Sequence, residues 1–187
     1  MKLHHQLLAA ATLLACMAAP IAAQAQTVSV IANHTAVNVG QSFSVDLQAT
    51  GFPDKVFGGG YNLAFDPSIL KLDDVVIPAS WEFAVSKGTL DAAAGTVTDV
   101  FFNTFTAPVK GDFLTATLKF TAIGGGTSKI EVSDSGSFPF GNEFGNAVPV
   151  TYANGTVTVS AVPEPSSWAL ALGGLACVGW VARRRQS

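Results

Sequence analysis

The sequence predicts an all-β protein whose central part is an antiparallel β-sandwich of about eight or nine strands. Several short runs alternate apolar and polar residues with period two, which is typical of half-buried strands. Gly, Pro, Asp and Ser separate these runs, and no long amphipathic helix competes with them. The two ends of the 187-residue chain differ in composition from the middle, which leaves 137 residues, Gln26 to Val162, for the sandwich. That length is usual for one domain with a single hydrophobic core.

The first 25 residues have the order of a secretory signal peptide. Lys2 precedes an apolar run from Leu7 to Ala19, and the small-residue site Ala23-Gln24-Ala25 follows it. We therefore expect signal peptidase to cleave after this site, so that the exported chain begins at Gln26.

A second interpretation of this end is a lipoprotein signal. Leu13-Leu14-Ala15-Cys16 resembles a bacterial lipoprotein box, in which Cys16 would carry a lipid after cleavage. The signal-peptidase interpretation is preferred, because the Ala-x-Ala site is better formed and the apolar run continues past Cys16.

The clearest strands lie in three places. Residues 43–50 and 114–121 alternate apolar with polar side chains. Residues 150–153 and 156–160 flank Asn154-Gly155, a pair suited to the positive φ angles of a two-residue hairpin turn. Shorter strands are expected at Val28 to Ala32, Gly60 to Phe65, Leu70 to Val76, Thr96 to Phe102 and Lys129 to Val132.

Turns are expected where the strands are interrupted. Asp66-Pro67 predicts a turn after the strand that ends at Phe65, with the Asp side chain accepting backbone hydrogen bonds. Gly58-Gly59-Gly60 and Gly124-Gly125-Gly126 indicate bulges or turns. Neither glycine run is a phosphate loop, because no helix follows it.

The composition of the middle part argues against several functions. Its 6 Lys, no Arg and 12 acidic residues amount to a net charge of −6, which disfavours nucleic-acid binding. His34 is its one histidine and it has no Cys, so hydrolases and zinc sites built on those residues are excluded. Calcium binding or paired glycosidase carboxylates would have to use Asp66, Asp73, Asp74 and Glu82. We interpret these four as turn formers and solvated strand ends, and expect no catalytic residue, metal or cofactor.

The candidate ligand-binding residues are aromatic. Trp81 could offer a flat ring to a sugar, and Phe138, Phe140 and Phe144 lie in a segment that proline and glycine keep from pairing as a strand. Core packing is the alternative for each ring, but these three Phe side chains cannot all easily point inward. An exposed apolar patch would indicate a partner, and the net charge of −6 favours a neutral glycan or a protein.

Four sequence blocks, taken in order, resemble a cohesin domain. They are Gly40 to Leu47, Gly59 to Leu72 with Phe65-Asp66-Pro67 and Leu70, Leu114 to Ala122, and Gly126 to Ile130. The resemblance spans most of residues 28–160. It implies a sandwich of the jelly-roll type that binds dockerins in cellulosomes and is related to a class of carbohydrate-binding modules.

The last 25 residues, 163–187, have the order of a membrane-held sorting signal. Pro163-Glu164-Pro165 precedes an apolar run, Trp168 to Ala182, which ends at Arg183, Arg184 and Arg185. A helix of this run is about 22 Å long, short of a hydrocarbon layer of about 30 Å unless the arginines snorkel. We expect a transmembrane helix over 168–182 whose arginines stay cytoplasmic, so that the middle domain faces outward.

This tail resembles the PEP-CTERM sorting signal of Gram-negative bacteria that make exopolysaccharide. The resemblance implies a tail held transiently in the inner membrane and processed by an exosortase near Pro163-Glu164-Pro165. The two prolines favour an extended backbone, and Glu164 is its one charged group. An ordinary C-terminal membrane anchor is the alternative.

Together these features predict an exported, non-enzymatic protein of the cell envelope or extracellular matrix. Adhesion or polysaccharide association in a biofilm is the favoured role, and a cohesin-type docking module and a carboxylate-based enzyme acting on polysaccharide are the alternatives. The expected partners are signal peptidase and exosortase for processing, the inner membrane, and a polysaccharide or protein ligand.

Overall fold

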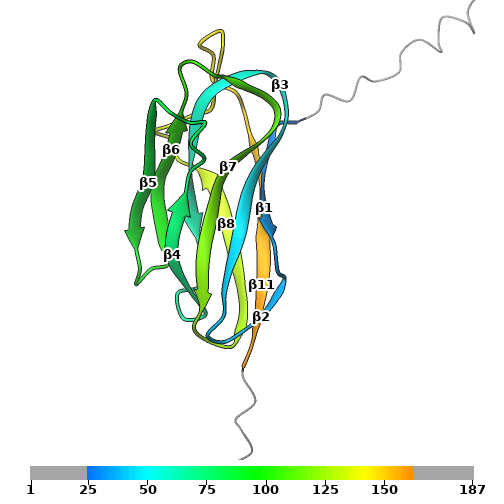
Figure 1. Cartoon of the computed structure of the whole chain (residues 1–187), viewed down its shortest axis with the longest axis vertical. Helices are drawn as coiled ribbons and strands as arrows, with labels where there is room; N and C mark the ends of the chain where they lie inside the picture. Colours follow the sequence, from blue (N-terminus) through cyan, green and yellow to red (C-terminus); the bar gives the residue numbers. More distant parts are fainter. Residues whose placement is uncertain (1–24, 162–187) are drawn as a thin grey trace, which may run out of the picture.

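The computed structural model describes residues 25–161, which form two facing β-sheets (Figure 1). Within that range no helix is long and apolar enough to cross a membrane. The strands are β1 (Thr27–Ala32), β2 (Ala36–Asn38), β3 (Ser42–Ala64), β4 (Leu70–Val76), β5 (Ala84–Asp91), β6 (Thr96–Asn103), β7 (Val109–Ala122), β8 (Gly126–Asp134), β9 (Gly141–Asn142), β10 (Thr151–Ala153) and β11 (Gly155–Ser160). Residues 1–24 of the expected signal peptide and the C-terminal segment from residue 162 lie outside the described residues.

The long strand β3 belongs to both sheets. Its first part pairs with β1 and β7, and its last part, from Gly58 to Ala64, pairs with β6 and β8. One sheet therefore has the order β4-β7-β3-β1-β10, and the other has the order β5-β6-β3-β8-β11-β2. In the described part of the chain, all pairs are antiparallel except the short pairs β1 with β10 and β11 with β2.

The predicted all-β sandwich is confirmed, although the strands divide differently from the expected eight or nine. Residues 25–161 contain eleven strands, of which β2, β9 and β10 have only two or three residues each. The expected strands at 43–50 and 60–65 are joined in β3, and β5 was not expected at all. The sequence carries no clear strand pattern for β5 because, as an edge strand, it exposes most of its side chains and shows little apolar alternation.

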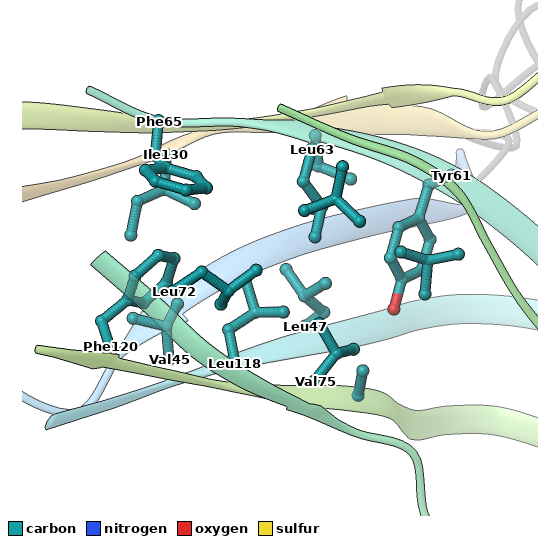
Figure 2. Close-up of a cluster of buried hydrophobic side chains, with 14 of the residues drawn as sticks. Val45, Leu47, Tyr61, Leu63, Phe65, Leu72, Val75, Leu118, Phe120 and Ile130 are labelled. Atoms are coloured by element: carbon teal, nitrogen blue, oxygen red, sulfur yellow. The ribbon is translucent and has the colours of Figure 1, made fainter. Parts of the chain in front are cut away.

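The core lies between the two sheets, as the period-two alternation requires. Figure 2 shows Val45, Leu47 and Leu118 of one sheet pointing toward Leu63 and Ile130 of the other. In the first part of β3, residues 42–50, the alternation persists, so the residues between the buried positions face solvent or the sheet margin, whereas Gly58 to Tyr61 are all buried. Burial of this surface is the main favourable contribution to folding.

The alternation predicted for residues 114–121 fails at one position. A register shift between Leu47 and Gln48 of β3 turns Thr115 inward and leaves Leu114 half-buried. The Thr115 hydroxyl donates to the Leu47 carbonyl oxygen at 2.8 Å and lies 3.1 Å from the Tyr61 hydroxyl. Desolvation raises the pKa of Tyr61, whose ring is fully buried. The inward Thr115 thus gives the Tyr61 hydroxyl a partner inside the core.

The turn predicted at Asp66-Pro67 is confirmed. The Asp66 carboxylate accepts hydrogen bonds from the Ser68 backbone N–H at 2.9 Å and from the Ser68 hydroxyl at 2.6 Å. These bonds hold the pKa of Asp66 below its ordinary value. The Asp66 carboxylate therefore forms its hydrogen bonds within its own turn and stabilises that turn.

The hairpin predicted at Asn154-Gly155 is wrong. The strand before this pair, β10, joins β1 in one sheet, while the strand after it, β11, joins β8 in the other. Asn154 and Gly155 form the crossover between the sheets, and neither has a positive φ angle. A Cβ on Gly155 would stand 2.6 Å from Cγ1 of Val30, so the glycine is needed for close approach of the chain to β1.

Candidate functional site

The outer face of the β5-β6-β3-β8 sheet carries a stacked aromatic pair. The rings of Phe101 in β6 and Phe138 in the loop after β8 have centroids 4.3 Å apart and an interplanar angle of 22°. Both side chains are half-buried. Gly60 in β3 lies beneath them, because a Cβ there would stand 2.7 Å from the Phe138 Cβ and 3.2 Å from the Phe101 Cβ. The missing side chain at Gly60 lets the loop lie flat on the sheet.

Two residues later the same loop enters the core. Phe140 is 1% exposed and packs against Phe52 and Phe102 at centroid distances of 5.5 and 5.7 Å. A Cβ on Gly59 would stand 2.6 Å from Cγ of Phe140. Phe138 and Phe140 therefore pack on opposite faces of β3, Phe138 on the outer face and Phe140 in the core. Gly58, Gly59 and Gly60 are thus part of β3, which accepts the rings. Of the two alternatives predicted there, a bulge or a turn, the structure has a register shift between Val56 and Gly58 and no turn.

The rings proposed as ligand contacts take three different positions. Trp81 is 3% exposed, donates its Nε1–H to the Leu114 carbonyl at 3.3 Å and packs against Phe102 at 4.6 Å. This burial corrects the expectation that Trp81 and Phe140 present rings to a ligand, because neither reaches the surface. Phe138 is half-buried on the outer sheet face, and Phe144 is 70% exposed.

The Asn62 side chain links three strands of the same sheet by hydrogen bonds. Its Oδ1 accepts a hydrogen bond from the Asp99 backbone N–H at 2.8 Å, and its Nδ2 donates to the Asp134 carbonyl at 3.0 Å. Asp99 has a φ of 58°, the left-handed region that a non-glycine residue seldom occupies, beside a register shift between Tyr61 and Leu63. Asn62 thus ties β6, β3 and β8 together around a bulge. A bulge depends on pairing between distant strands, so no local sequence signal marks these residues.

A groove lies at the end of the sheet where β6 finishes and β9 begins. Its volume is about 660 Å³, and its lining includes Phe83, Asn103, Phe105, Asn142, Glu143 and Asn146. The exposed rings of Phe83 and Phe105 form a pair with centroids 5.7 Å apart. No local pattern in the sequence singles out these two rings, because they are 22 positions apart and only the pairing of β5 with β6 brings them together.

Glu82 fixes the loop that carries Phe105. Its Oε1 accepts hydrogen bonds from the backbone N–H groups of Phe105 at 3.0 Å and Thr106 at 2.9 Å, and from the Thr106 hydroxyl at 2.9 Å. Hydrogen bonding from the Thr104 side chain, then from backbone N–H groups, holds the pKa of Glu82 far below its ordinary value. Glu82 therefore acts as an ionised acceptor that orders the loop.

Each acidic side chain considered for calcium or glycosidase chemistry has its own hydrogen-bond or salt-bridge partners. Asp73 contacts Lys71 at 2.9 Å and Thr121 at 2.5 Å, and Asp74 contacts Lys87 at 2.6 Å. Among the residues that the structure describes, no three His, Cys, Asp or Glu side chains are grouped so that they could hold a metal ion. The four carboxylates do not form one site.

The processing residues lie at or beyond the limits of the described chain. Ala25 and Gln26 immediately precede β1, and the Gln26 carbonyl accepts a hydrogen bond from the Thr151 backbone N–H at 2.8 Å. Ala23, the sorting motif Pro163-Glu164-Pro165 and the three terminal arginines fall outside the described residues.

Two family profiles match the sequence. The profile of the cohesin domain matches residues 27–159, and the profile of the PEP-CTERM protein-sorting motif matches residues 161–185. Both resemblances noted in the sequence are thereby confirmed. No curated protein sequence matches the chain significantly.

Solved structures with the same fold are cohesins. A type I cohesin in complex with a dockerin from Clostridium thermocellum gives a TM-score of 0.59 at 14% identity, covering 72% of this chain and 99% of that one. A cohesin module from a Clostridium perfringens family 33 glycoside hydrolase gives 0.62 at 14% identity, covering 74% and 98%. A non-cellulosomal cohesin from the archaeon Archaeoglobus fulgidus gives 0.57 at 17% identity, covering 76% and 96%. At these identities the likeness establishes the fold.

Proposed function

Because the chain belongs to the cohesin family, we propose that its sandwich is a docking module that binds a protein partner through the outer face of β5-β6-β3-β8. The observation that carries the proposal is the stacked Phe101–Phe138 pair on that face, where Phe101 pairs with Gly60 of β3. Aromatic rings that are partly exposed on an ordered surface are the usual anchors of protein interfaces.

In the opposite sheet, the outer face of β3 and β7 offers no comparable aromatic surface in the described part of the chain. The outward positions of β3 and β7 there are small, polar or charged, namely Ser42, Ser44, Asp46, Gln48, Thr117 and Lys119. Such a face is well solvated and lacks an aromatic anchor. The contrast between the two sheets supports the Phe101–Phe138 face as the docking surface.

The type of partner follows from the relatives. The C. thermocellum cohesin is in complex with a dockerin, which supports a protein as the partner here. Cohesin domains are non-catalytic docking modules, and the separate hydrogen bonding of Asp66, Asp73, Asp74 and Glu82 argues against the alternative of a carboxylate-based enzyme. Polysaccharide association, the role favoured by the sequence, remains a prediction.

The sorting motif indicates an exported protein that is sorted to the cell envelope. We expect that residues 168–182 hold the chain transiently in the inner membrane and that an exosortase processes it near Pro163-Glu164-Pro165. The last strand ends at Ser160, so the motif begins directly after the folded domain. Replacing all three motif residues by Ala should leave full-size protein in the inner membrane. Normal size and release of this variant would contradict the sorting role.

The docking proposal is tested by photo-crosslinking from two faces. A photoreactive residue replaces Thr98, which is exposed on the outer face of β6, or Gln48 on the opposite sheet as the matched control. The proposal expects one partner to be captured from position 98 and not from position 48, and excess unlabelled protein to suppress the capture.

The captured partner is then purified and its affinity measured. Phe101→Ala should weaken binding at least about tenfold, and Gln48→Ala should leave it unchanged. Equal capture from both faces, or undiminished affinity of a folded Phe101→Ala variant, would contradict the proposal.

A further inference from the structure

The groove beside β9 carries phenylalanine rings that are exposed to solvent and are not part of the hydrophobic core. Phe83 is 68% exposed and Phe105 is 72% exposed, yet their rings lie side by side at 5.7 Å with an interplanar angle of 37°. Phe144, 70% exposed, lies between two lining residues, Glu143 and Gly145. Contiguous exposed apolar surface on a soluble domain marks a place where something binds.

The ring pair is held in place before any ligand arrives. The Phe83 backbone N–H donates to the Asn103 carbonyl at 3.1 Å, which fixes the start of β5 against the end of β6. Glu82 accepts the Phe105 N–H at 3.0 Å, and the Thr104 N–H donates to the Phe57 carbonyl at 2.8 Å. Because the backbone under both rings is ordered, a ligand that stacks on them loses little of its affinity to ordering the protein.

The rest of the groove wall carries polar side chains that are free to hydrogen-bond a ligand. The side chains of Asn103, Asn146 and Glu143 line the groove and form no hydrogen bond with other groups in residues 25–161. An amide offers two donors and an acceptor, and a carboxylate accepts from several hydroxyls. Flat rings together with such groups suit a sugar, whose C–H faces are apolar and whose edges carry hydroxyls.

The charge of the groove disfavours anionic ligands. Glu143 is the charged residue among its lining residues, and none of them is Lys, Arg or His. A phosphate, an anionic sugar or an anionic lipid surface would meet a carboxylate and no cation here. The complementary ligand is therefore uncharged and rich in hydroxyls.

The groove lies beside the end of β6 and beside β9. Figure 1 shows that β11 leaves the sandwich at the opposite end. Val159, next to the last residue of β11, pairs with Gly126 at the start of β8, whereas the loop that lines the groove begins beyond Asp134 at the other end of β8. A polymer bound in the groove would thus lie away from Ser160, the last residue of β11.

We propose that this groove binds a neutral glycan, with Phe83 and Phe105 stacked on sugar rings and with Asn103, Asn146 and Glu143 hydrogen-bonded to sugar hydroxyls. This site is additional to the docking face, whose Phe101 precedes the groove residue Asn103 by two positions in β6, and it gives the predicted polysaccharide association a definite place.

The test is affinity electrophoresis of the full-length protein, purified in detergent, through native gels that contain a soluble neutral polysaccharide. Hydroxyethyl cellulose, galactomannan and dextran are the neutral probes, and polygalacturonate is the anionic comparison. At least one neutral polymer should retard the protein, whereas polygalacturonate should not. The double variant Phe83→Ala/Phe105→Ala should show at least about tenfold weaker binding, and Phe105→Trp should retain binding.

Two controls separate this site from the docking face and from misfolding. Ile123→Ala removes a side chain that is 46% exposed at the opposite end of the sandwich and should bind like the wild type. Phe101→Ala should also bind glycan normally. The inference is overturned if no neutral polymer retards the protein, if only polygalacturonate does, or if the double variant keeps its melting temperature and its retardation. Loss of retardation in Phe101→Ala alone would overturn it as well and assign glycan binding to the sheet face.

Discussion

The ring of Phe140 lies directly against the backbone of Gly59, so that a Cβ at position 59 would stand 2.6 Å from Cγ and 2.7 Å from both Cδ atoms of the ring. The ring cannot withdraw, because Phe52 and Phe102 contact its other sides. This contact is what allows the loop after β8 to cross β3 and present Phe138 on the outer face.

Gly59→Ala should therefore destabilise the domain. The added methyl group overpacks the core, for which a cost of about 1 to 3 kcal/mol is typical. The free energy of unfolding, from urea denaturation, checks this value. Gly141→Ala is the matched control, because no heavy atom lies within 4 Å of a Cβ there. Equal stability of the two variants would show that the Phe140 ring is free to move.

Phe140→Ala and Trp81→Ala should each lower stability severely, whereas Phe144→Ala should not. Removal of a buried Phe or Trp costs about 3 to 5 kcal/mol, a large part of the total stability of about 5 to 15 kcal/mol of a typical domain. Phe144 is 70% exposed, so its removal should change stability by less than about 0.5 kcal/mol. Melting temperatures of the three variants decide this, and a stable Trp81→Ala variant would contradict the core position of Trp81.

Gly155→Ala should be destabilising in a way that depends on Val30. A Cβ at position 155 would stand 2.6 Å from Cγ1 of Val30, so the two side chains would compete for one space. In a Val30→Ala background the cost of Gly155→Ala should fall, because the clashing methyl group is gone. A double-mutant cycle measures the coupling, which for residues in contact is about 0.5 to 3 kcal/mol. Strict additivity would contradict the close approach.

Glu82 should make stability depend on acidity. The hydrogen bonds of the Glu82 carboxylate hold its folded-state pKa far below the ordinary value of 4.5. At pH values between the two, the unfolded chain binds more protons, so the contribution of Glu82 is present above about pH 4.5 and is lost as the pH falls toward the depressed value. Melting temperatures of the wild type and Glu82→Gln should differ most near pH 7 and converge on acidification. Parallel pH profiles would be inconsistent with the shift.

The exported protein should begin at Gln26 and contain no disulfide. Cys16 lies in the expected signal peptide and Cys177 in the expected transmembrane helix, so the sandwich has no cysteine to oxidise. N-terminal sequencing of the exported form should yield Gln26, and stability should not respond to a reducing agent. A lipidated Cys16 at the N-terminus would establish the lipoprotein alternative instead.

Features that depend on neighbouring residues were predictable from the sequence. Alternation at residues 43–49 determines which side chains of β3 enter the core, because successive side chains of a strand point to opposite faces. Asp66 forms its turn with Ser68, two residues away, and residue type is sufficient to predict it. The order of the sandwich and the sorting motif is likewise a linear property of the chain.

Features that depend on which segments meet were decided by the tertiary structure alone. Asn154-Gly155 carries the sequence signal of a hairpin, yet it crosses between sheets, because β10 and β11 find partners in β1 and β8 that lie far away in the sequence. Phe138 and Phe140 have the same residue type, and only the two faces of β3 at Gly60 and Gly59 determine that Phe138 is half-buried on the outer face and Phe140 is buried in the core. Phe83 and Phe105 become a pair only when β5 aligns with β6. Burial is a property of the assembled surface against which a side chain packs, and a short window of sequence does not contain that surface.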